Sequence, residues 1–409
     1  MTDDRRRDPG APLSGPPDPW AETDMPTIRD GPPWHMTEMI EAEPAMAQRL
    51  LDRLAVRDSA AARLATAVRA TAELRRPILV TGCGTSEHGA MATAEILTEA
   101  LRSAGLVGGG GQAIPPAAVQ AFEASLEAEL GGPGSLLIGI SHEGATWATL
   151  EALRAGKAVG ATTALVTCSD RSPGAALADI VLATEELDRS WCHTIGYLSP
   201  ILAATAVAGH LTGANVGGQA VRGLLRAGLE PGAVARTEGF ARVLAPASHV
   251  VVIGSGADRV AARELTLKIE EGTHVGASSR DLETVLHGHL AGMDETTGFV
   301  LILADARGAD GRARRAKGVL RAVGELGIGA GAILGSAYVD KVPEELTPAG
   351  RLVLPAVQDL PDAIGALLGT AVPLQLLTER LARERGVNPD PIRRDDPRYL
   401  RAAEAPSAT

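Results

Sequence analysis

Three charged residues on one predicted helix have the side chains and the spacing that proton transfer requires. In the stretch ARELTLKIEEGTH, Glu264, Lys268 and Glu271 stand at i, i+4 and i+7, which places them on one helical face. A carboxylate can act as a general acid or base, and a neighbouring carboxylate or lysine tunes its pKa. The spacing alone, however, favours a solvated stripe of ion pairs, which contributes little to stability.

Two turns rich in Gly, Ser and Thr have the composition of anion-binding loops. The first is GCGTSEHGA (82–90) and the second is ISHEGAT (140–146), and each lies between a predicted strand and a predicted helix. Free backbone N–H groups, hydroxyls and the positive end of a helix dipole all attract an anion. Such turns are common packing devices, but two in one half of the chain favour an anion site at the carboxyl ends of the strands.

Two histidines follow the charged helix in the stretch ETVLHGH. His287 can be interpreted as a helix-end histidine with its hydrogen bonds satisfied, and this interpretation is stronger still for His289. The HxH spacing also raises the question of a metal site. No third ligand lies nearby, and side chains at i and i+2 of a helix diverge, so the sequence predicts no metal.

Apolar runs alternate with helical patterns along most of the chain, which predicts parallel βαβ units. A strand followed by a Gly-containing turn and a helix occurs twice, about 170 residues apart along the chain. We therefore predict a duplicated α/β fold with two similar lobes. The expected strands are 76–82, 135–140, 163–167, 180–183, 249–256, 299–303, 329–334 and 352–355, with long helices over 194–211, 258–271 and 363–385.

The composition of the chain limits the classes of partner and the cellular location that we expect. The chain has 409 residues, a net charge of −11 and 2% aromatic residues, which argues against nucleic acid as a partner. Three scattered cysteines indicate a reducing compartment, and no apolar run reaches the length of a membrane span, so we expect a cytoplasmic protein without membrane contact. The expected organisation is a disordered leader over 1–33, N-terminal helices over 34–75, a first domain over 76–230, a second over 231–385 and a C-terminal tail over 386–409.

Several of these motifs together resemble a known family. GCGTS, SHEGAT, the block Glu264–Leu290 and the closing VPLQLLTERLARERGVNPD are similar to sugar isomerase (SIS) domains. More narrowly, residues 34–402 resemble the isomerase half of glucosamine-6-phosphate synthase. The glutaminase half of that enzyme needs a cysteine at its mature N-terminus, whereas this chain starts Met1-Thr2, so we expect no glutaminase domain.

The resemblance implies a fold, an assembly and a set of roles. The family folds as two SIS lobes, each a flavodoxin-like three-layer αβα unit with a parallel sheet, and works as a dimer with shared active sites. Its ExxxLKLKE helix matches Glu264 to Glu271, which places the proton-transfer glutamate on Glu271 and the lysine on Lys268. Its ring-opening histidine, which reaches into the neighbouring subunit's site, matches His287. The residues implied to hold the substrate or its phosphate are Gly84, Thr85, Ser86, Ser141, His142, Glu143, Gly144, Thr146, His193 and Thr194.

The sequence departs from the family at several of these positions. The family's phosphate loop S-Q-S-G-E-T is here Ser-His-Glu-Gly-Ala-Thr, so His142 replaces the glutamine and Glu143 the middle serine. His193 stands where the family has another phosphate-contacting serine, and Ala402 stands where it has a catalytic lysine, with Arg401 one place away.

Glu143 in the phosphate loop leaves three alternatives, because an unpaired carboxylate repels a phosphate. His142, His193 or Arg189 could pair with it, it could point away, or the substrate could carry a hydroxyl or amine in place of phosphate. The hydroxyls that persist favour a phosphorylated sugar. They belong to Thr85, Ser86, Ser141 and Thr146.

The resemblance implies an enzyme that isomerises, and deaminates, an amino-sugar phosphate or a close analogue, without a cofactor. His287 would open the ring and Glu271 would carry a proton between C1 and C2. Two alternatives stay open: a non-catalytic sugar-binding SIS protein, and an ammonia-transferring subunit served by a separate glutaminase chain. Retention of the Glu271 and His287 pair speaks against the first, and a neighbouring glutaminase gene would support the second.

Overall fold

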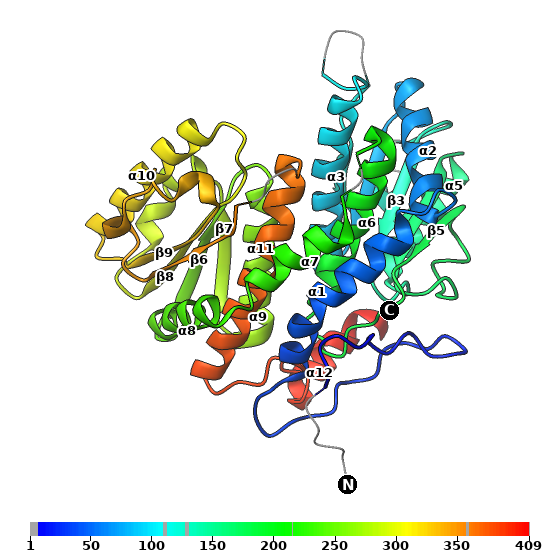
Figure 1. The fold of residues 1–409 in the computed structure, drawn as a ribbon. Helices are drawn as coiled ribbons and strands as arrows, with labels where there is room; N and C mark the ends of the chain where they lie inside the picture. The colour runs from blue at the N-terminus through cyan, green and yellow to red at the C-terminus, as the bar shows by residue number, and fades with distance from the viewer. Residues whose placement is uncertain (1–6, 109–112, 127–130, 215, 357–359, 409) are drawn as a thin grey trace.

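Two lobes, each built on a five-stranded parallel sheet, stand side by side with a layer of helices between them (Figure 1). The computed structural model describes residues 7–108, 113–126, 131–214, 216–356 and 360–408. The predicted two-lobed α/β fold, with parallel sheets flanked by helices, is thereby confirmed.

The first lobe has the strand order β2-β1-β3-β4-β5, and every neighbouring pair is parallel. This is the flavodoxin-like order, in which the direction of winding reverses between the first and third strands. The sequence predicts four of the five strands to within two residues at either end, and it misses β2. The strands are β1 (Ile78–Gly82), β2 (Ala117–Gln120), β3 (Leu136–Ile140), β4 (Thr162–Thr167) and β5 (Ile180–Ala183).

The second lobe repeats the same topology, with β6 in the place of β1. Its order is β7-β6-β8-β9-β10, again entirely parallel, so the predicted internal repeat is present in three dimensions. The sequence misses β7, the edge strand that corresponds to β2. The strands are β6 (His249–Ile253), β7 (Gly276–Arg280), β8 (Thr297–Leu303), β9 (Ala330–Leu334) and β10 (Gly350–Val353).

Helices connect the strands and fill the space between the lobes. The α-helices are α1 (His35–Leu54), α2 (Ala60–Glu73), α3 (Thr85–Ser103), α4 (Ala121–Leu126), α5 (Trp147–Ala158), α6 (Ile195–Thr212), α7 (Gly218–Ala227), α8 (Pro231–Leu244), α9 (Asp258–Thr273), α10 (Ala309–Glu325), α11 (Asp362–Glu384) and α12 (Pro397–Glu404). Short 3₁₀ turns are η2 (Thr284–Leu286), η3 (His289–Gly292), η4 (Ser336–Tyr338), η5 (Glu344–Leu346) and η6 (Ala405–Ala408).

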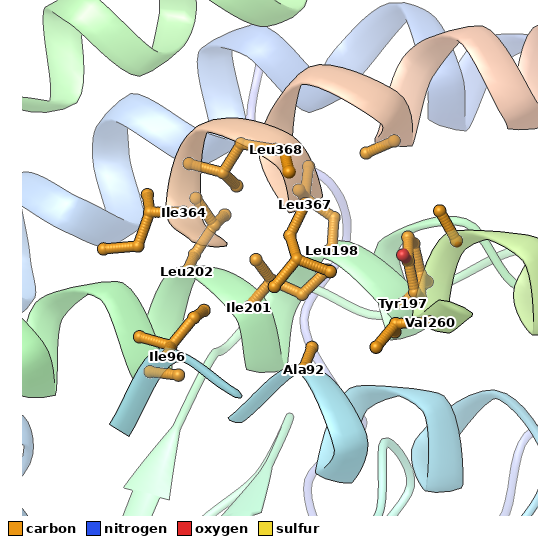
Figure 2. Close-up of a cluster of buried hydrophobic side chains, with 14 of the residues drawn as sticks. Ala92, Ile96, Tyr197, Leu198, Ile201, Leu202, Val260, Ile364, Leu367 and Leu368 are labelled. Carbon is orange, nitrogen blue, oxygen red and sulfur yellow. The ribbon is translucent and has the colours of Figure 1, made fainter. Parts of the chain in front are cut away.

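One hydrophobic core joins the two lobes. Figure 2 shows the part of it where α3 and α6 from the first lobe meet α9 and α11 from the second. Each fully buried large aliphatic side chain there contributes about 1.5–3 kcal/mol, so the lobes are held in a fixed relation. The labelled side chains are Ala92, Ile96, Tyr197, Leu198, Ile201, Leu202, Val260, Ile364, Leu367 and Leu368. Helix α6 is long and apolar enough to span a membrane, but 83% of it is buried in this core.

The segment predicted as a disordered leader follows the surface of the first lobe. Its first six residues lie outside the described part, and from residue 7 to residue 34 the chain forms no helix or strand. The side chain of Leu13 is 4% exposed, and its backbone N–H donates to Glu186 Oε2 at 2.9 Å. The Ser14 carbonyl accepts the Leu187 N–H at 3.3 Å, and the Asp18 carboxylate pairs with Arg171.

Glycines at the strand-to-helix turns allow α3 and α9 to begin directly after β1 and β6. A Cβ on Gly82 would stand 2.5 Å from the Ser86 carbonyl oxygen, and one on Gly254 would meet the Asp258 carbonyl oxygen equally closely. Backbone atoms cannot move aside as the end of a side chain can. We therefore expect Gly82→Ala and Gly254→Ala each to lower the free energy of unfolding by about 1–3 kcal/mol in urea denaturation.

The matched control is Gly223→Ala, inside α7, where no atom lies within 4 Å of the added methyl group. Alanine is a better helix former than glycine by about 1 kcal/mol, so this variant should be slightly more stable than the wild type. Equal stability of all three variants would contradict the close approach at the two turns.

Candidate active site between the lobes

The two sequence-predicted loops come together at the switch point of the first lobe. Gly82–Ser86 follows β1 and Ser141–Thr146 follows β3, and these neighbouring strands are where the winding of the sheet reverses. Ligands of open α/β sheets bind at such points, beyond the carboxyl ends of the strands. Gly84 adopts φ of +57° at the start of α3, a conformation that glycine adopts without strain.

The predicted acid–base residues of α9 face this switch point from the second lobe. The Lys268 ammonium lies 2.5 Å from Glu271 Oε2 and 3.6 Å from Glu264 Oε1. The side chains of Lys268 and Glu264 are 0% exposed, and that of Glu271 is 21% exposed. The solvated stripe that the spacing alone favours is therefore wrong, because the three side chains form a buried ion-pair cluster.

Two residues of α3 connect this cluster to the first lobe. His88 Nδ1 lies 2.6 Å from Glu264 Oε2, and the Thr85 hydroxyl donates to Glu264 Oε1 at 3.4 Å. Ser86, next to Thr85, is half-buried. Five side chains from α3 and α9 thus form one site, and Glu271 is its most exposed carboxylate.

Lys268 and Glu271 differ in how their surroundings shift their pKa values. Burial by itself would lower the pKa of Lys268, but the Glu271 and Glu264 carboxylates together raise it, so Lys268 is a fixed cation. Burial raises the pKa of Glu271 although Lys268 opposes the shift. A carboxylate with a raised pKa, partly open to the outside and beside a fixed cation, suits a general base near neutral pH.

The loop after β3 is compact and closes on itself. The Ser141 hydroxyl lies 3.1 Å from the Thr146 hydroxyl and accepts the Gly144 N–H at 3.1 Å. Gly144 has φ of +71°, and a Cβ there would collide with Ser172 and Thr167, so this position requires glycine. Thr146 is exposed and its hydroxyl keeps further hydrogen-bonding capacity, whereas Ser141 is 0% exposed and its hydroxyl is bonded within the loop.

His142 and Asp188 form a buried pair beneath the loop. His142 Nε2 accepts the Asp188 backbone N–H at 3.0 Å, and burial lowers the pKa of His142 to about 4, so the ring is neutral near pH 7. The Asp188 carboxylate accepts the N–H of Gly196 at 2.6 Å and the Thr194 hydroxyl at 3.3 Å. Burial raises the pKa of Asp188 to about 6. Thr194 is therefore committed to Asp188, whereas the half-buried His193 lies with its ring 5.3 Å from that of His142.

Glu143 is half-buried and has no ion-pair partner among the residues that the structure describes. Arg189, one of the partners considered from the sequence, instead donates to the Ser14 hydroxyl. Burial, reinforced by the Glu143 carboxylate, raises the pKa of the Cys168 thiol to about 12, and Cys168 directly follows β4. The same carboxylate opposes the lowering of the His142 pKa, so the charge of Glu143 acts on both His142 and Cys168.

His287 stands apart from the cluster in this chain. Its side chain is 70% exposed, and Nε2 lies 2.8 Å from Glu283 Oε1, which also pairs with Arg315. No contact between His287 and Glu271 occurs within the described part of the chain. His289 Nδ1 accepts from Arg280 Nε at 3.2 Å. No group of three or more potential metal ligands occurs in the described ranges.

Sequence reasoning missed His88 and Asp188. His88 stands three residues after Thr85 on α3, so the helical spacing was an available signal that it shares a face with the predicted site. Asp188 lies six residues before Thr194 in an irregular segment. No local pattern indicates that its carboxylate meets the N-terminus of α6.

The fold and the site define a two-lobed α/β protein with a buried acid–base cluster between its lobes. Solved structures of the same architecture include the C-terminal domain of glucosamine-fructose-6-phosphate aminotransferase from Francisella tularensis, with a TM-score of 0.73, 19% identity and coverage of 88% of this chain and 98% of that one. Tagatose-6-phosphate ketose/aldose isomerase from Escherichia coli has a TM-score of 0.67 and 18% identity over 90% of this chain and 97% of that one. Glucosamine-6-phosphate deaminase from Thermotoga maritima has a TM-score of 0.64 and 18% identity over 87% of this chain and 96% of that one.

These similarities confirm, at the level of the fold, the double-SIS resemblance that the sequence predicts. No protein-family model and no curated protein matches the chain.

Replacing Lys268 with methionine should destabilise the protein strongly, because it leaves the Glu264 and Glu271 carboxylates buried without their cation. Breaking a buried ion pair in this way costs about 3–5 kcal/mol. A buried, unpaired carboxylate gains by taking up a proton, so the folded variant binds protons that the unfolded chain does not. The deficit relative to wild type should therefore shrink as the pH falls from about 8 to about 5, measured by urea denaturation.

The double variant Lys268→Met/Glu264→Gln is the control, because it removes one of the two carboxylates together with the lysine. It should recover part of the lost stability at the higher pH. A deficit that is the same at both pH values would contradict a role for Lys268 as the counter-ion.

Proposed function

We propose that this protein is an aldose–ketose isomerase that acts on a sugar phosphate, and that it deaminates the substrate when C2 carries an amine. The observation that carries the proposal is the cluster at the switch point, where Glu271 is paired with Lys268 and still partly exposed. Relatives in fold include a ketose/aldose isomerase and a glucosamine-6-phosphate deaminase. The same site would serve both reactions.

Glu271 acts as the base that moves a proton between two carbons. It takes the proton from C2 of the open-chain aldose, and the electron pair forms an enediolate whose negative charge Lys268 offsets. Return of the proton to C1, with transfer of the O2 proton to O1, gives the ketose. With an amine at C2 the same transfer gives an imine, which water hydrolyses to the ketose and ammonia.

The anionic end of the substrate fits the two turns of the first lobe. Thr85 and Ser86 begin α3, and the hydroxyls of Ser141 and Thr146 lie beside the start of α5. Neither helix has a side-chain cap at its N-terminus, so the dipole end is available to an anion. Phosphate binding in this cradle requires the second of the three alternatives considered from the sequence, in which the Glu143 carboxylate points away from the bound anion.

Ring opening requires a second group, for which we propose His287 of a second copy of the chain. The exposed position of His287 in one chain supports this assignment, because a side chain 70% exposed is free to enter a neighbour's site. The active form is then a homodimer with shared sites.

A cytoplasmic location remains a prediction.

A non-catalytic sugar-binding role is the second candidate. It is favoured by the loss of the family's catalytic lysine: Ala402 stands at that position and lies exposed on α12. Turnover of any sugar phosphate by the purified protein would exclude it. Ammonia transfer with a separate glutaminase chain would instead require that such a chain bind to this one.

A thermal-shift panel tests the substrate class directly. Glucosamine 6-phosphate and fructose 6-phosphate should raise the melting temperature, because a ligand that binds only the folded state stabilises it. Glucosamine and fructose without phosphate should have much smaller effects, with inorganic phosphate as the control. Stabilisation by the free sugars alone would mean that Glu143 has replaced the phosphate and would overturn the phosphosugar proposal.

Glu271→Gln should lower the isomerisation rate by about 10²–10⁴-fold with little loss of binding, because the amide cannot accept the proton. In the wild type the raised pKa of Glu271 predicts an acid limb of the pH–rate profile above the ordinary glutamate value, with the rate rising as the base ionises.

Mixing inactive Glu271→Gln and His287→Ala proteins tests the shared site. Subunit exchange places an intact Glu271 next to an intact His287, so activity should return. Failure to recover activity, with exchange shown independently by mass spectrometry of the mixed dimer, would place both residues in one chain's site or remove His287 from catalysis.

A further inference from the structure

The C-terminal tail returns to the first lobe and is fixed there at a buried aspartate. After α11 the chain crosses below α1 (Figure 1). The Asp390 carboxylate, which is 0% exposed, accepts the N–H groups of His35 at 2.8 Å and Met36 at 2.9 Å. The Asp390 carbonyl accepts the Trp191 N–H at 3.0 Å. The tail therefore has a defined position four residues before Arg394.

Arg394 lies against the segment of the first lobe that carries His193. Its guanidinium carbon is 4.9 Å from the centroid of the Trp191 ring, within the range of a cation–π contact. The Arg394 side chain is half-buried and has no hydrogen-bond or ion-pair partner among the described residues. A guanidinium held in this way keeps all its N–H groups available.

Trp191, on which Arg394 stacks, lies two residues before His193, and the His193 ring is 5.3 Å from that of His142 in the loop after β3. Burial lowers the pKa of His193, with His142, Lys268 and Arg394 adding to the shift, so its ring is neutral near pH 7. The buried carboxylate of Asp188 is already bound to backbone N–H groups of α6. An anion entering beside Trp191 would meet the Arg394 guanidinium, which pairs with no carboxylate among the described residues.

The adjacent arginine is arranged differently, although it also stacks on an aromatic ring. Arg393 lies 4.1 Å from the centroid of the Tyr399 ring, within the tail itself. Its charge acts on Asp396 and on His274, which is the C-cap residue of α9. Arg393 therefore closes the turn of the tail, whereas Arg394 faces the first lobe.

We propose that Arg394 binds the anionic group of the substrate, held in place by Trp191 and assisted by His193. This inference rests on the proposed function, and it adds an anion-binding residue that lies outside the turns after β1 and β3. The planar fork of a guanidinium matches two oxygens of a phosphate monoester, which is the class of anion assigned here. Arg394 is a binding and specificity residue, since no proton passes through it.

The test is isothermal titration of glucosamine 6-phosphate and of glucosamine into the full-length wild type and three variants. Arg394→Gln should weaken binding of the phosphorylated sugar by about tenfold or more and leave binding of the free sugar unchanged, because a charge-assisted hydrogen bond is lost. Trp191→Leu should weaken it less, since the guanidinium remains but loses its support. Arg393→Gln is the matched control and should bind both ligands as the wild type does.

The outcomes separate the two proposals. If the wild type prefers the phosphorylated sugar and Arg394→Gln matches Arg393→Gln, the role of Arg394 is overturned and the proposed function stands. If the wild type binds neither ligand, the proposed function fails and this inference fails with it. Arg394→Lys keeps the positive charge but not the planar guanidinium, so its affinity for glucosamine 6-phosphate should lie between those of the wild type and Arg394→Gln. With this second variant, misfolding of Arg394→Gln alone cannot decide the result.

Discussion

A lysine ammonium held without solvent between two carboxylates is the constraint around which this protein is arranged. Lys268 is 0% exposed and pairs with Glu271 and Glu264, and Glu264 in turn contacts His88 of the other lobe. Desolvating such charges is favourable only when the geometry is close to ideal. The shared core of α3, α6, α9 and α11 supplies that geometry, because it fixes one lobe against the other.

The two lobes have the same topology and different uses. In the second lobe the switch point is filled by Asp305, which is 0% exposed, accepts the Ala257 N–H at 3.2 Å and pairs with Arg307 and Arg312. In the first lobe the corresponding turns present hydroxyls, and Glu143 in the second of them pairs with no arginine or lysine among the described residues. Under the proposed function the two copies have diverged: the second lobe would supply the acid–base helix, and the first would supply the cradle for a ligand.

Local pattern predicts much of this fold and only part of its site. The eight strands with apolar runs were predictable, whereas β2 (AAVQ) and β7 (GASSR) are short edge strands that consist mostly of small or polar residues and have no fully buried position. Helical spacing places Glu264, Lys268 and Glu271 on one face, but it does not show whether that face is buried. Helical spacing also places His88 on the face of Thr85, but its contact with Glu264 joins segments far apart in the chain, and Asp188 lies in an irregular segment without a periodic pattern.

The helix N-termini of the molecule differ in what satisfies their backbone donors. Among the described residues, carboxylates of the chain itself meet the N-termini of five helices: Asp390 at α1, Asp188 at α6, Asp305 at α9, Glu99 at α11 and Asp396 at α12. Each satisfies backbone donors that would otherwise attract a ligand. Helices α3 and α5 lack a side-chain cap and start beside each other at the switch point. Under the proposed function, a phosphate bound there would satisfy backbone donors of the kind that the protein's own carboxylates satisfy at other helices, with Lys268 on the facing helix α9.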